Sequence, residues 1–469
     1  MKAIRLVCHF SGLILPLIFL AGCGQQQTSV DAAIYNSLKS YIDSIKVIDT
    51  HQHQKLSSIL RGGEVNFYTI LSTTGLGTDL VSAGSPGLDA DMIERGDLDS
   101  LWKTYGVFLD RCRNTSVYGH LVQSFRILYD MDEPYFTRDN IEKLSAQLAH
   151  NYNNPESWYR EALEKAPIEL MLNDQWWDQF KVRTDFESHA LVMRIDMYMV
   201  SIAHRAELER ADADTMSNPF YQARREDFEI RDLDDYLAFA DRWFAKFVER
   251  GALCAKTANA YHRSIDYRNV SKEEAYRLFA RPPETLTPGQ RKRLEDYMFF
   301  WCVGKCAEYD LPLQIHTGYL AGNSRSLENG RPMKLLDVFQ AFPQVKFSLF
   351  HGGFPWYQEI GALAKSYPNV YVDLCWLPVI SRETAVSALH QWLDCVPYTK
   401  FFWGGDCYTV EDAVGSLEYG RDVVAQVLAE RVSAGRMSME LAREVARGIF
   451  RNNAIRFFKL KEKFGKDFN

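Results

Sequence analysis

Eight short apolar segments, spread over most of the chain, constrain its fold more than any other feature. They cover residues 46–49, 168–172, 191–194, 252–255, 313–316, 346–350, 369–374 and 400–403. Amphipathic stretches, for example 333–341 and 382–394, separate the later segments from one another. Strands that alternate with helices pair in parallel, and eight of them predict a closed (β/α)8 TIM-type barrel of the α/β class.

Two of the intervals between these segments are too long for a single helix. Residues 56–166 are mostly helical in pattern and predict a helical insertion between the first and second strands, covering the barrel mouth. Residues 197–250 predict two or three further helices. We therefore expect residues 46–461 to form the barrel with its insertion, and residues 23–45 to form a tether and an N-terminal helix.

The first 22 residues have the pattern of a secretory signal peptide. Lys2 and Arg5 precede a short apolar run, and Leu20-Ala21-Gly22-Cys23 follows it. This last motif resembles the bacterial lipobox, which implies cleavage before Cys23 and a lipid on its sulfur; the alternative is an ordinary signal peptide with an incidental cysteine. The lipoprotein interpretation predicts an exported protein, held at the bacterial cell envelope by lipid alone, and Gly24 favours the outer membrane.

Composition argues against some partners. The chain has 54 basic and 61 acidic residues, a net charge of −7, and no basic stripe, so nucleic acid is not expected to bind. Apart from Cys8 and Cys23, seven cysteines remain without regular spacing, and we expect no disulfide framework. The sequence leaves the oligomeric state open.

Residues with metal-binding side chains follow several of the predicted strands. In TIM barrels the active site lies at the carboxyl ends of the strands. Residues two apart in an extended segment point to the same side, so the two histidines of His51-Gln52-His53 can face one ion. Imidazoles with a carboxylate suit a divalent metal, for which we expect zinc, in one or two copies. The residues at the ends of the first, fourth, fifth, sixth and eighth segments are His51, His53, Lys256, His316, His351 and Asp406.

Other residues near the strand ends are candidates for binding a small-molecule substrate. An inward-facing Arg194 would hold a substrate carboxylate through two hydrogen bonds, or it would pair with barrel neighbours instead. His262 would reach the pocket or lie outside it. Asp174, Trp376 and Tyr408 follow the second, seventh and eighth strands, and each would either line the pocket or take part in catalysis.

The order of these residues resembles the amidohydrolase superfamily. The segments Val47-Ile48-Asp49-Thr50-His51-Gln52-His53 and Phe350-His351-Gly352-Gly353-Phe354-Pro355 resemble its amidohydrolase-2-related branch. The resemblance implies that a divalent metal is held by His51, His53, His316 and Asp406, and that a metal-bound water is the nucleophile.

The resemblance also bears on the catalytic residues. Asp406 would take the water proton and pass it to the leaving group. His351 would act as a base or stabilise an oxyanion if one ion is bound, or would bind a second ion. Lys256 would bridge two ions as a carbamate, bind a substrate carboxylate, or be only a surface or salt-bridged lysine.

Three functions are compatible with this site. The first is a metal-dependent hydrolase acting on an amide, lactone or ester bond of a small molecule. The second is a decarboxylase (a lyase) or an isomerase similar to the uronate isomerases, which also resemble this branch. The third is a non-enzymatic surface lipoprotein that binds a solute or glycan. A complete set of metal ligands argues for an enzyme.

Overall fold

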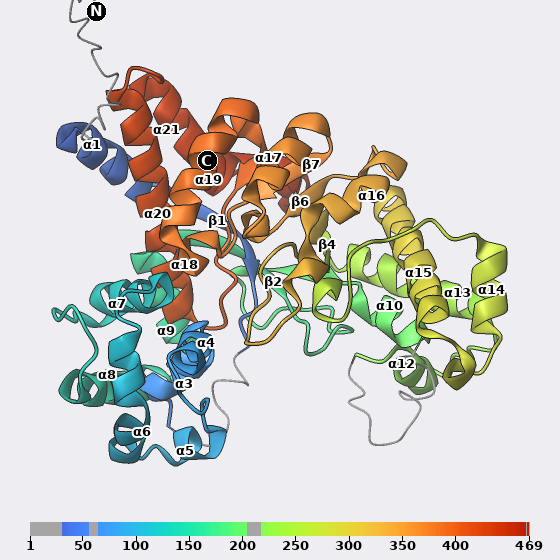
Figure 1. Ribbon diagram of the computed structural model, residues 1–469, viewed down its shortest axis with the longest axis horizontal. Coiled ribbons are helices and arrows are strands. Elements are labelled where there is room, and N and C mark those ends of the chain that lie inside the picture. Colours follow the sequence, from blue (N-terminus) through green and yellow to red (C-terminus); the bar gives the residue numbers. More distant parts are fainter. Residues whose placement is uncertain (1–30, 56–63, 204–216, 466, 469) are drawn as a thin grey trace, which may run out of the picture.

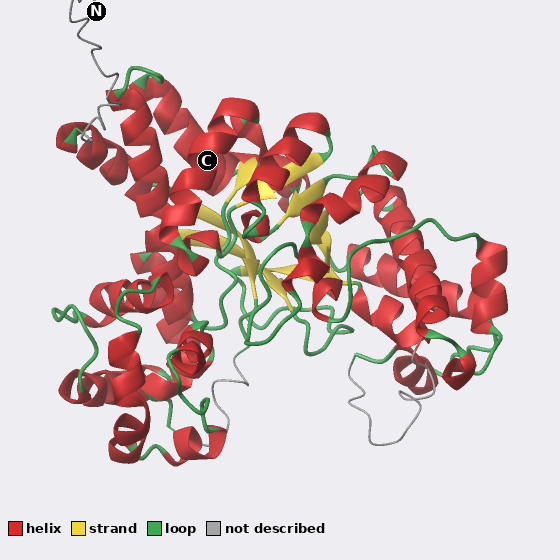
Figure 2. Cartoon of the chain, viewed as in Figure 1, coloured by secondary structure: helices red, strands yellow, loops and turns green. Residues whose placement is uncertain are grey.

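The fold is built around a barrel of eight parallel strands. The computed structural model describes residues 31–55, 64–203, 217–465 and 467–468. Its strands pair in the order β1 to β8 along the chain and form a nearly closed barrel at the centre of the molecule (Figures 1 and 2). All eight predicted segments contain strands, and the (β/α)8 barrel is confirmed. The strands are β1 (Val47–Gln52), β2 (Ile168–Asp174), β3 (His189–Arg194), β4 (Cys254–Thr257), β5 (Leu313–Ile315), β6 (Phe347–Leu349), β7 (Val370–Asp373) and β8 (Phe401–Phe402).

Backbone hydrogen bonds join β1 to the end of β8. The Thr50 amide donates to the Trp403 carbonyl over 3.3 Å, and the Asp406 amide donates to the His51 carbonyl over 2.8 Å. Strand pairing therefore places Asp406 beside His51, although the two residues are far apart in the sequence.

Helices cover the outside of the barrel. α15 shows how they start: Thr287 and Gln290 form a capping box and Pro288 occupies the first turn. The helices between β3 and the C-terminal segment are α10 (Asp196–Ala203), α12 (Pro219–Arg225), α13 (Leu233–Glu249), α14 (Lys272–Phe279), α15 (Pro288–Glu308), α16 (Leu336–Ala341), α17 (Tyr357–Ser366), α18 (Leu377–Ile380), α19 (Arg382–Cys395), α20 (Val410–Ser433) and α21 (Met439–Arg447).

The predicted helical insertion between the first two strands is confirmed. Its helices form a lobe to one side of the barrel mouth, at the lower left of Figure 1. Glu411, at the start of α20, accepts hydrogen bonds from three aromatic side chains of this lobe and so ties it to the barrel. The lobe consists of α3 (Phe67–Ser72), α4 (Leu76–Ser82), α5 (Ala90–Arg95), α6 (Leu98–Arg111), α7 (Ser116–Tyr129), α8 (Arg138–Asn151) and α9 (Pro155–Lys165).

The first and last described helices pack against the outer helices and the wall of the barrel. α1 (Ala32–Asp43) lies against α20 and α21. After a π-helical turn at Gly448–Asn452, α22 (Asn453–Phe457) and α23 (Leu460–Phe464) follow. The Phe457 ring lies 4.7 Å from that of Tyr371 on β7, so aromatic packing joins α22 to the barrel wall.

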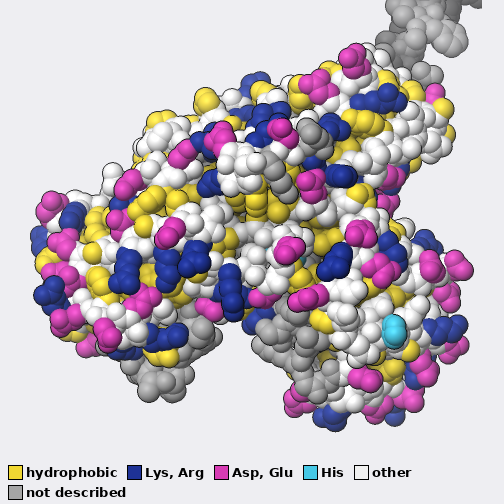
Figure 3. All heavy atoms as spheres, turned by 180° about the vertical axis from the view of Figure 1, so that it is seen from behind, with side chains coloured by type: hydrophobic (Ala, Val, Ile, Leu, Met, Phe, Trp, Pro, Cys, Tyr) yellow, Lys and Arg dark blue, Asp and Glu magenta, His cyan; other side chains and the backbone are white. Residues whose placement is uncertain are grey.

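The described residues contain neither a disulfide nor a membrane-spanning helix. The cysteines at 112, 254, 302, 306, 375, 395 and 407 are all free, as expected. No described helix is both long enough and apolar enough to cross a bilayer. The predicted signal peptide and Cys23 lie outside the described residues. On the face shown in Figure 3, basic and acidic side chains are interspersed over the surface.

Candidate metal centre and active-site cavity

The carboxyl ends of β1, β5, β6 and β8 bring five of the predicted residues into one cluster. The Nε2 atoms of His51 and His53 are 3.3 Å apart, and Asp406 Oδ1 lies 3.6 and 3.2 Å from them. On the other side, His351 Nε2 lies 3.7 Å from Asp406 Oδ2 and 3.0 Å from His316 Nδ1. Asp406 therefore stands between the two pairs of histidines.

Three of these histidines direct a nitrogen lone pair into the cluster. His53 Nδ1 donates to the Asp174 carbonyl over 2.8 Å, and His351 Nδ1 donates to the Cys375 carbonyl over 3.0 Å. His316 Nε2 donates to the Tyr319 carbonyl over 2.7 Å. Because each outward nitrogen carries the proton, each inward nitrogen is free to coordinate, and such outer hydrogen bonds orient metal-binding histidines in general.

The protonation of the histidines suits a cation. Burial, together with the charge of Lys256, holds the pKa of His51 and of His316 well below the ordinary value. Burial also lowers the pKa of His351 to about 4. Neutral imidazoles facing one another at 3.0–3.3 Å have only lone pairs to share, so a divalent ion fits this donor set.

Asp406 supplies the negative charge of the cluster. Burial alone would raise its pKa, but the close contacts with His53, His51 and His351 outweigh burial and hold the pKa well below its usual range. The carboxylate is therefore ionised, as a metal ligand or a proton acceptor must be.

Lys256 reaches the same cluster from β4. Its Nζ lies 3.2 Å from His51 Nε2 and 3.8 Å from the centre of the Phe350 ring. The side chain is 1% exposed, and burial lowers its pKa. This placement argues against a surface role, and it is compatible with both a bridging carbamate and a substrate contact.

Buried carboxyl groups beneath the cluster hold the strand ends in place. Asp49 accepts hydrogen bonds from the amides of His51 and Gly405 at 3.1 and 3.0 Å. Asp373 accepts one from the Thr50 hydroxyl at 2.7 Å. Burial raises the pKa of Asp49 to about 7 and that of Asp373 to about 6. These bonds link the ends of β1, β7 and β8.

Left-handed backbone conformations aim three side chains at the mouth. His351, Trp376 and Asp406 have φ angles of 60°, 59° and 60°, a region that residues other than glycine rarely adopt. Each follows the end of a strand: β6, β7 and β8 respectively. Backbone strain of this kind concentrates at functional sites.

A cavity of about 530 Å³ opens above the cluster. His53, Lys256, His316 and Asp406 lie on its wall. The helical insertion supplies another part of the wall through Thr73, Thr74, Gly75 and Thr78. A volume of this size suits a small-molecule substrate.

The predicted substrate-binding residues all line this cavity, but they differ in whether other groups of the protein already bind them. Trp376 lies edge-on to His351, with ring centres 5.5 Å apart. His262 is exposed on the wall. Arg194 forms 2.5 Å ion pairs with both Asp174 and Asp196, so its charge is already neutralised within the barrel.

Sequence reasoning missed two groups at this site, one beside the cluster and one on the cavity wall. Cys375 follows β7, and its sulfur lies within 4.8 Å of ligand atoms of His351 and Asp406. Burial raises the pKa of the Cys375 thiol well above its ordinary value, so the thiol stays protonated. Arg325 lines the cavity from the segment after β5. Cys375 could have been found from the sequence, because active-site residues of TIM barrels lie at the carboxyl ends of strands. Arg325 could not have been found in this way, because it lies too far beyond the end of β5.

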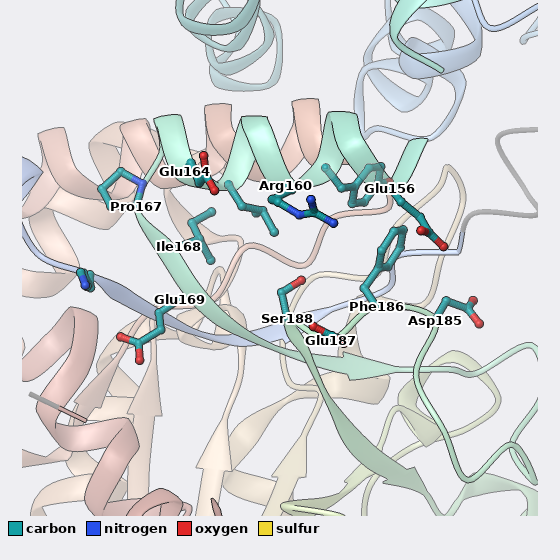
Figure 4. Close-up of a pocket in the computed structure, with 13 residues that line it drawn as sticks. Glu156, Arg160, Glu164, Pro167, Ile168, Glu169, Asp185, Phe186, Glu187 and Ser188 are labelled. Atoms are coloured by element: carbon teal, nitrogen blue, oxygen red, sulfur yellow. The ribbon is translucent and has the colours of Figure 1, made fainter. Parts of the chain in front are cut away.

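A second cavity, of about 660 Å³, lies elsewhere on the barrel (Figure 4). Residues 175–188, all within the described part of the chain, contain no helix, and this cavity lies where they and α9 meet the start of β2. Arg160 and Glu164 project from α9, while Phe186 and Ser188 belong to the segment before β3 (Figure 4). None of the clustered histidines lines it, so the candidate active site is the smaller cavity.

Comparisons with known proteins agree with this geometry. The chain is 29% identical over 222 residues to protein fluG of Emericella nidulans, a match that covers 44% of this chain and 25% of that protein. Two solved structures share the fold: a uronate isomerase of Thermotoga maritima (TM-score 0.71, 14% identity, 92% of this chain and 98% of that one) and a glucuronate isomerase of Caulobacter crescentus (TM-score 0.72, 16% identity, 91% and 94%). The family model described as Amidohydrolase matches residues 220–460, about half of the chain. The protein belongs to the amidohydrolase family.

Proposed function

We propose that the protein is a metal-dependent hydrolase that cleaves an amide, lactone or ester bond of a small molecule. The observation that carries this proposal is the convergence of four inward-facing imidazoles on the Asp406 carboxylate at the floor of a cavity. Zinc is the ion we expect, because imidazole nitrogens with one carboxylate suit it. A divalent ion held there would lower the pKa of a coordinated water from 15.7 to about 7.

The residues of the cluster have separate tasks in this reaction. His51, His53, His316 and Asp406 would hold the ion. Asp406, ionised and partly accessible to the cavity, accepts the proton of the attacking water and passes it to the leaving group.

Two further groups act on the substrate oxygen that becomes negative. Lys256 Nζ, within 3.2 Å of His51, can donate to a developing oxyanion or to a substrate carboxylate. His351 provides a second polar contact from β6 if one ion is bound, and would become a ligand if two are bound.

Lyase or isomerase chemistry on the same residues is the second candidate. Uronate isomerases share the barrel fold, although at 14–16% identity this likeness concerns the fold alone. Product mass separates the reactions: hydrolysis adds one water, isomerisation conserves the mass, and decarboxylation releases CO₂.

Elemental analysis of the purified protein that lacks residues 1–23 tests the metal site directly. We expect one or two ions per chain. Two ions would favour a bridging Lys256, whereas one would leave Lys256 for the substrate and His351 for catalysis. If no ion binds even after zinc or manganese is added, the metalloenzyme proposal is wrong.

Replacing one ligand tests the link between metal and turnover. His53→Ala removes one coordinating nitrogen, and we expect metal-dependent turnover to fall at least about 100-fold with the fold retained. His150→Ala, at an exposed position on α8, is the matched control and should keep wild-type turnover. Full activity of His53→Ala, measured with the same metal, would place the site elsewhere.

A further inference from the structure

The charged side chains that line the active-site cavity differ in whether they already have a polar partner within the protein. Three carboxylates line it: Asp196, Asp406 and Asp412. Asp196 accepts from Arg194 at 2.5 Å and from the Ala258 amide at 2.9 Å. Asp412 Oδ1 lies 2.7 Å from Nε2 of the buried His120. With Asp406 in the histidine cluster, each of these carboxylates already has its partners.

The guanidinium of Arg325 differs from these groups in its contacts. Arg325 is exposed on the cavity wall, its Nε donates to the Ala321 carbonyl over 3.3 Å, and it lies 5.8 Å from the Tyr261 ring. Within the described residues, no carboxylate forms an ion pair with it. Arg194, in contrast, is bound to two carboxylates at 2.5 Å and is not available to a substrate.

The segment that carries Arg325 is held in place from three sides. The Ala321 amide donates to the Tyr261 hydroxyl over 2.9 Å, and Asn323 Nδ2 donates to the Thr78 carbonyl of the insertion over 3.2 Å. Nearer the cluster, His316 donates to the Tyr319 carbonyl. The backbone below the guanidinium is therefore positioned before any ligand arrives, which lowers the ordering cost of binding.

We infer that Arg325 binds a carboxylate of the substrate, at a point remote from the bond that is cleaved. The aromatic side chains of Trp176, Trp376 and Tyr408 line the same cavity and would accommodate the apolar or cyclic body of the molecule. The substrate class is then a small carboxylic acid with a hydrolysable bond at its other end. This inference rests on the proposed function for the position of the cleaved bond, but not for the anion-binding subsite itself.

Binding of paired probes tests the subsite. The metal-loaded protein is titrated with the dicarboxylates succinate, glutarate and adipate, and with the monoamide of each, by isothermal calorimetry. Each pair differs only in whether the second end is charged. We expect at least one dicarboxylate to bind about 5- to 10-fold more tightly than its monoamide, with a preference that shrinks as salt is added.

Variants assign this preference to Arg325. Arg325→Ala should abolish it, and Arg325→Lys should retain part of it, because the charge remains while the planar fork is lost. Arg436→Ala, at an exposed arginine outside the cavity, should leave it unchanged. The melting temperatures of all three variants, compared with wild type, report on folding.

The outcomes distinguish this inference from the proposed function. Equal binding of every dicarboxylate and its monoamide, or a preference that survives in a folded Arg325→Ala variant, would overturn the subsite. An Arg325-dependent preference in a protein that holds no metal would support the subsite and refute the hydrolase proposal.

Discussion

Histidines in this protein differ by what their two ring nitrogens face. In the cluster, His53, His316 and His351 each donate outward to a carbonyl and keep a lone pair inward. His189, at the start of β3, has both nitrogens occupied: Nε2 lies 3.2 Å from Gln54 Oε1, and Nδ1 lies 3.2 Å from Ser188 Oγ. The histidines of the cluster therefore have a nitrogen free to coordinate an ion, whereas both nitrogens of His189 are already in polar contacts within the protein.

His189 should make stability depend on pH. Burial lowers its pKa to about 3, so between pH 6.5 and 3 the unfolded state binds more protons than the folded state, and unfolding becomes easier as the pH falls. Relative to wild type, His189→Gln should gain about 3 kcal/mol of unfolding free energy between pH 7 and pH 4, the linkage expected for a pKa lowered from 6.5 to about 3. Urea titrations of chelator-treated protein measure this change.

An exposed histidine provides the control for that experiment. His150→Gln on α8 should follow the wild-type pH dependence. A His189→Gln profile parallel to wild type would show that His189 is charged in the folded protein.

At the scale of elements, the first turn of α20 joins the barrel to the insertion. Glu411 is fully buried and accepts from Tyr129, Tyr152 and Trp158 at 2.6, 2.7 and 2.9 Å. These donors belong to the end of α7, the residue after α8, and α9. One carboxylate thus satisfies three aromatic donors from the lobe that walls the active-site cavity.

Glu411→Gln should loosen this lobe. An amide has one acceptor oxygen, so at least one buried donor loses its partner, and we expect the free energy of unfolding to fall by about 1–3 kcal/mol. Hydrogen exchange should accelerate most in α7 and α9. Glu418→Gln, on the same helix in a partly exposed pair with Lys39, should cost less than about 1 kcal/mol. Equal losses in the two variants would contradict the anchoring role.

At the scale of the whole molecule, the wall of the active-site cavity is formed by segments that are far apart in the sequence. The barrel contributes the candidate ligands, the insertion contributes Thr73, Thr74, Gly75 and Thr78, and the segment after β5 contributes Arg325. In Figure 1 the insertion and the group of α12 to α15 stand on opposite sides of the barrel mouth. Access to the candidate metal centre is therefore shaped by elements outside the barrel itself.

We also propose that the whole protein is exported and lipid-anchored through Cys23. The basic start, the apolar run and Leu20-Ala21-Gly22-Cys23 support this proposal. Cys23→Ser should abolish incorporation of labelled palmitate and shift the protein from the membrane to the soluble fraction. Cys395→Ser, at a partly buried free thiol, should keep both properties. Unchanged labelling of Cys23→Ser would contradict the proposal.

Much of the fold was predictable because its signals are local. Each barrel strand is a compact apolar run, and His51, His53, His316, His351 and Asp406 follow such runs at once. Since parallel strands end at one rim, adjacency in sequence to a strand end is enough to predict that these side chains meet. The predicted ligands do converge in the structure.

The sequence by itself therefore determined the strand order, the barrel and the set of side chains at its rim, because these depend on short-range patterns. Only the tertiary structure decided which charged side chains have an ion-pair partner. Arg194 forms an ion pair with Asp174, twenty residues away, and is therefore not available to bind substrate. Arg325 forms no ion pair with a carboxylate of the described residues. Electrostatic pairing depends on distances of a few ångströms between segments far apart in the chain, and such distances exist only once the barrel and its insertion have packed.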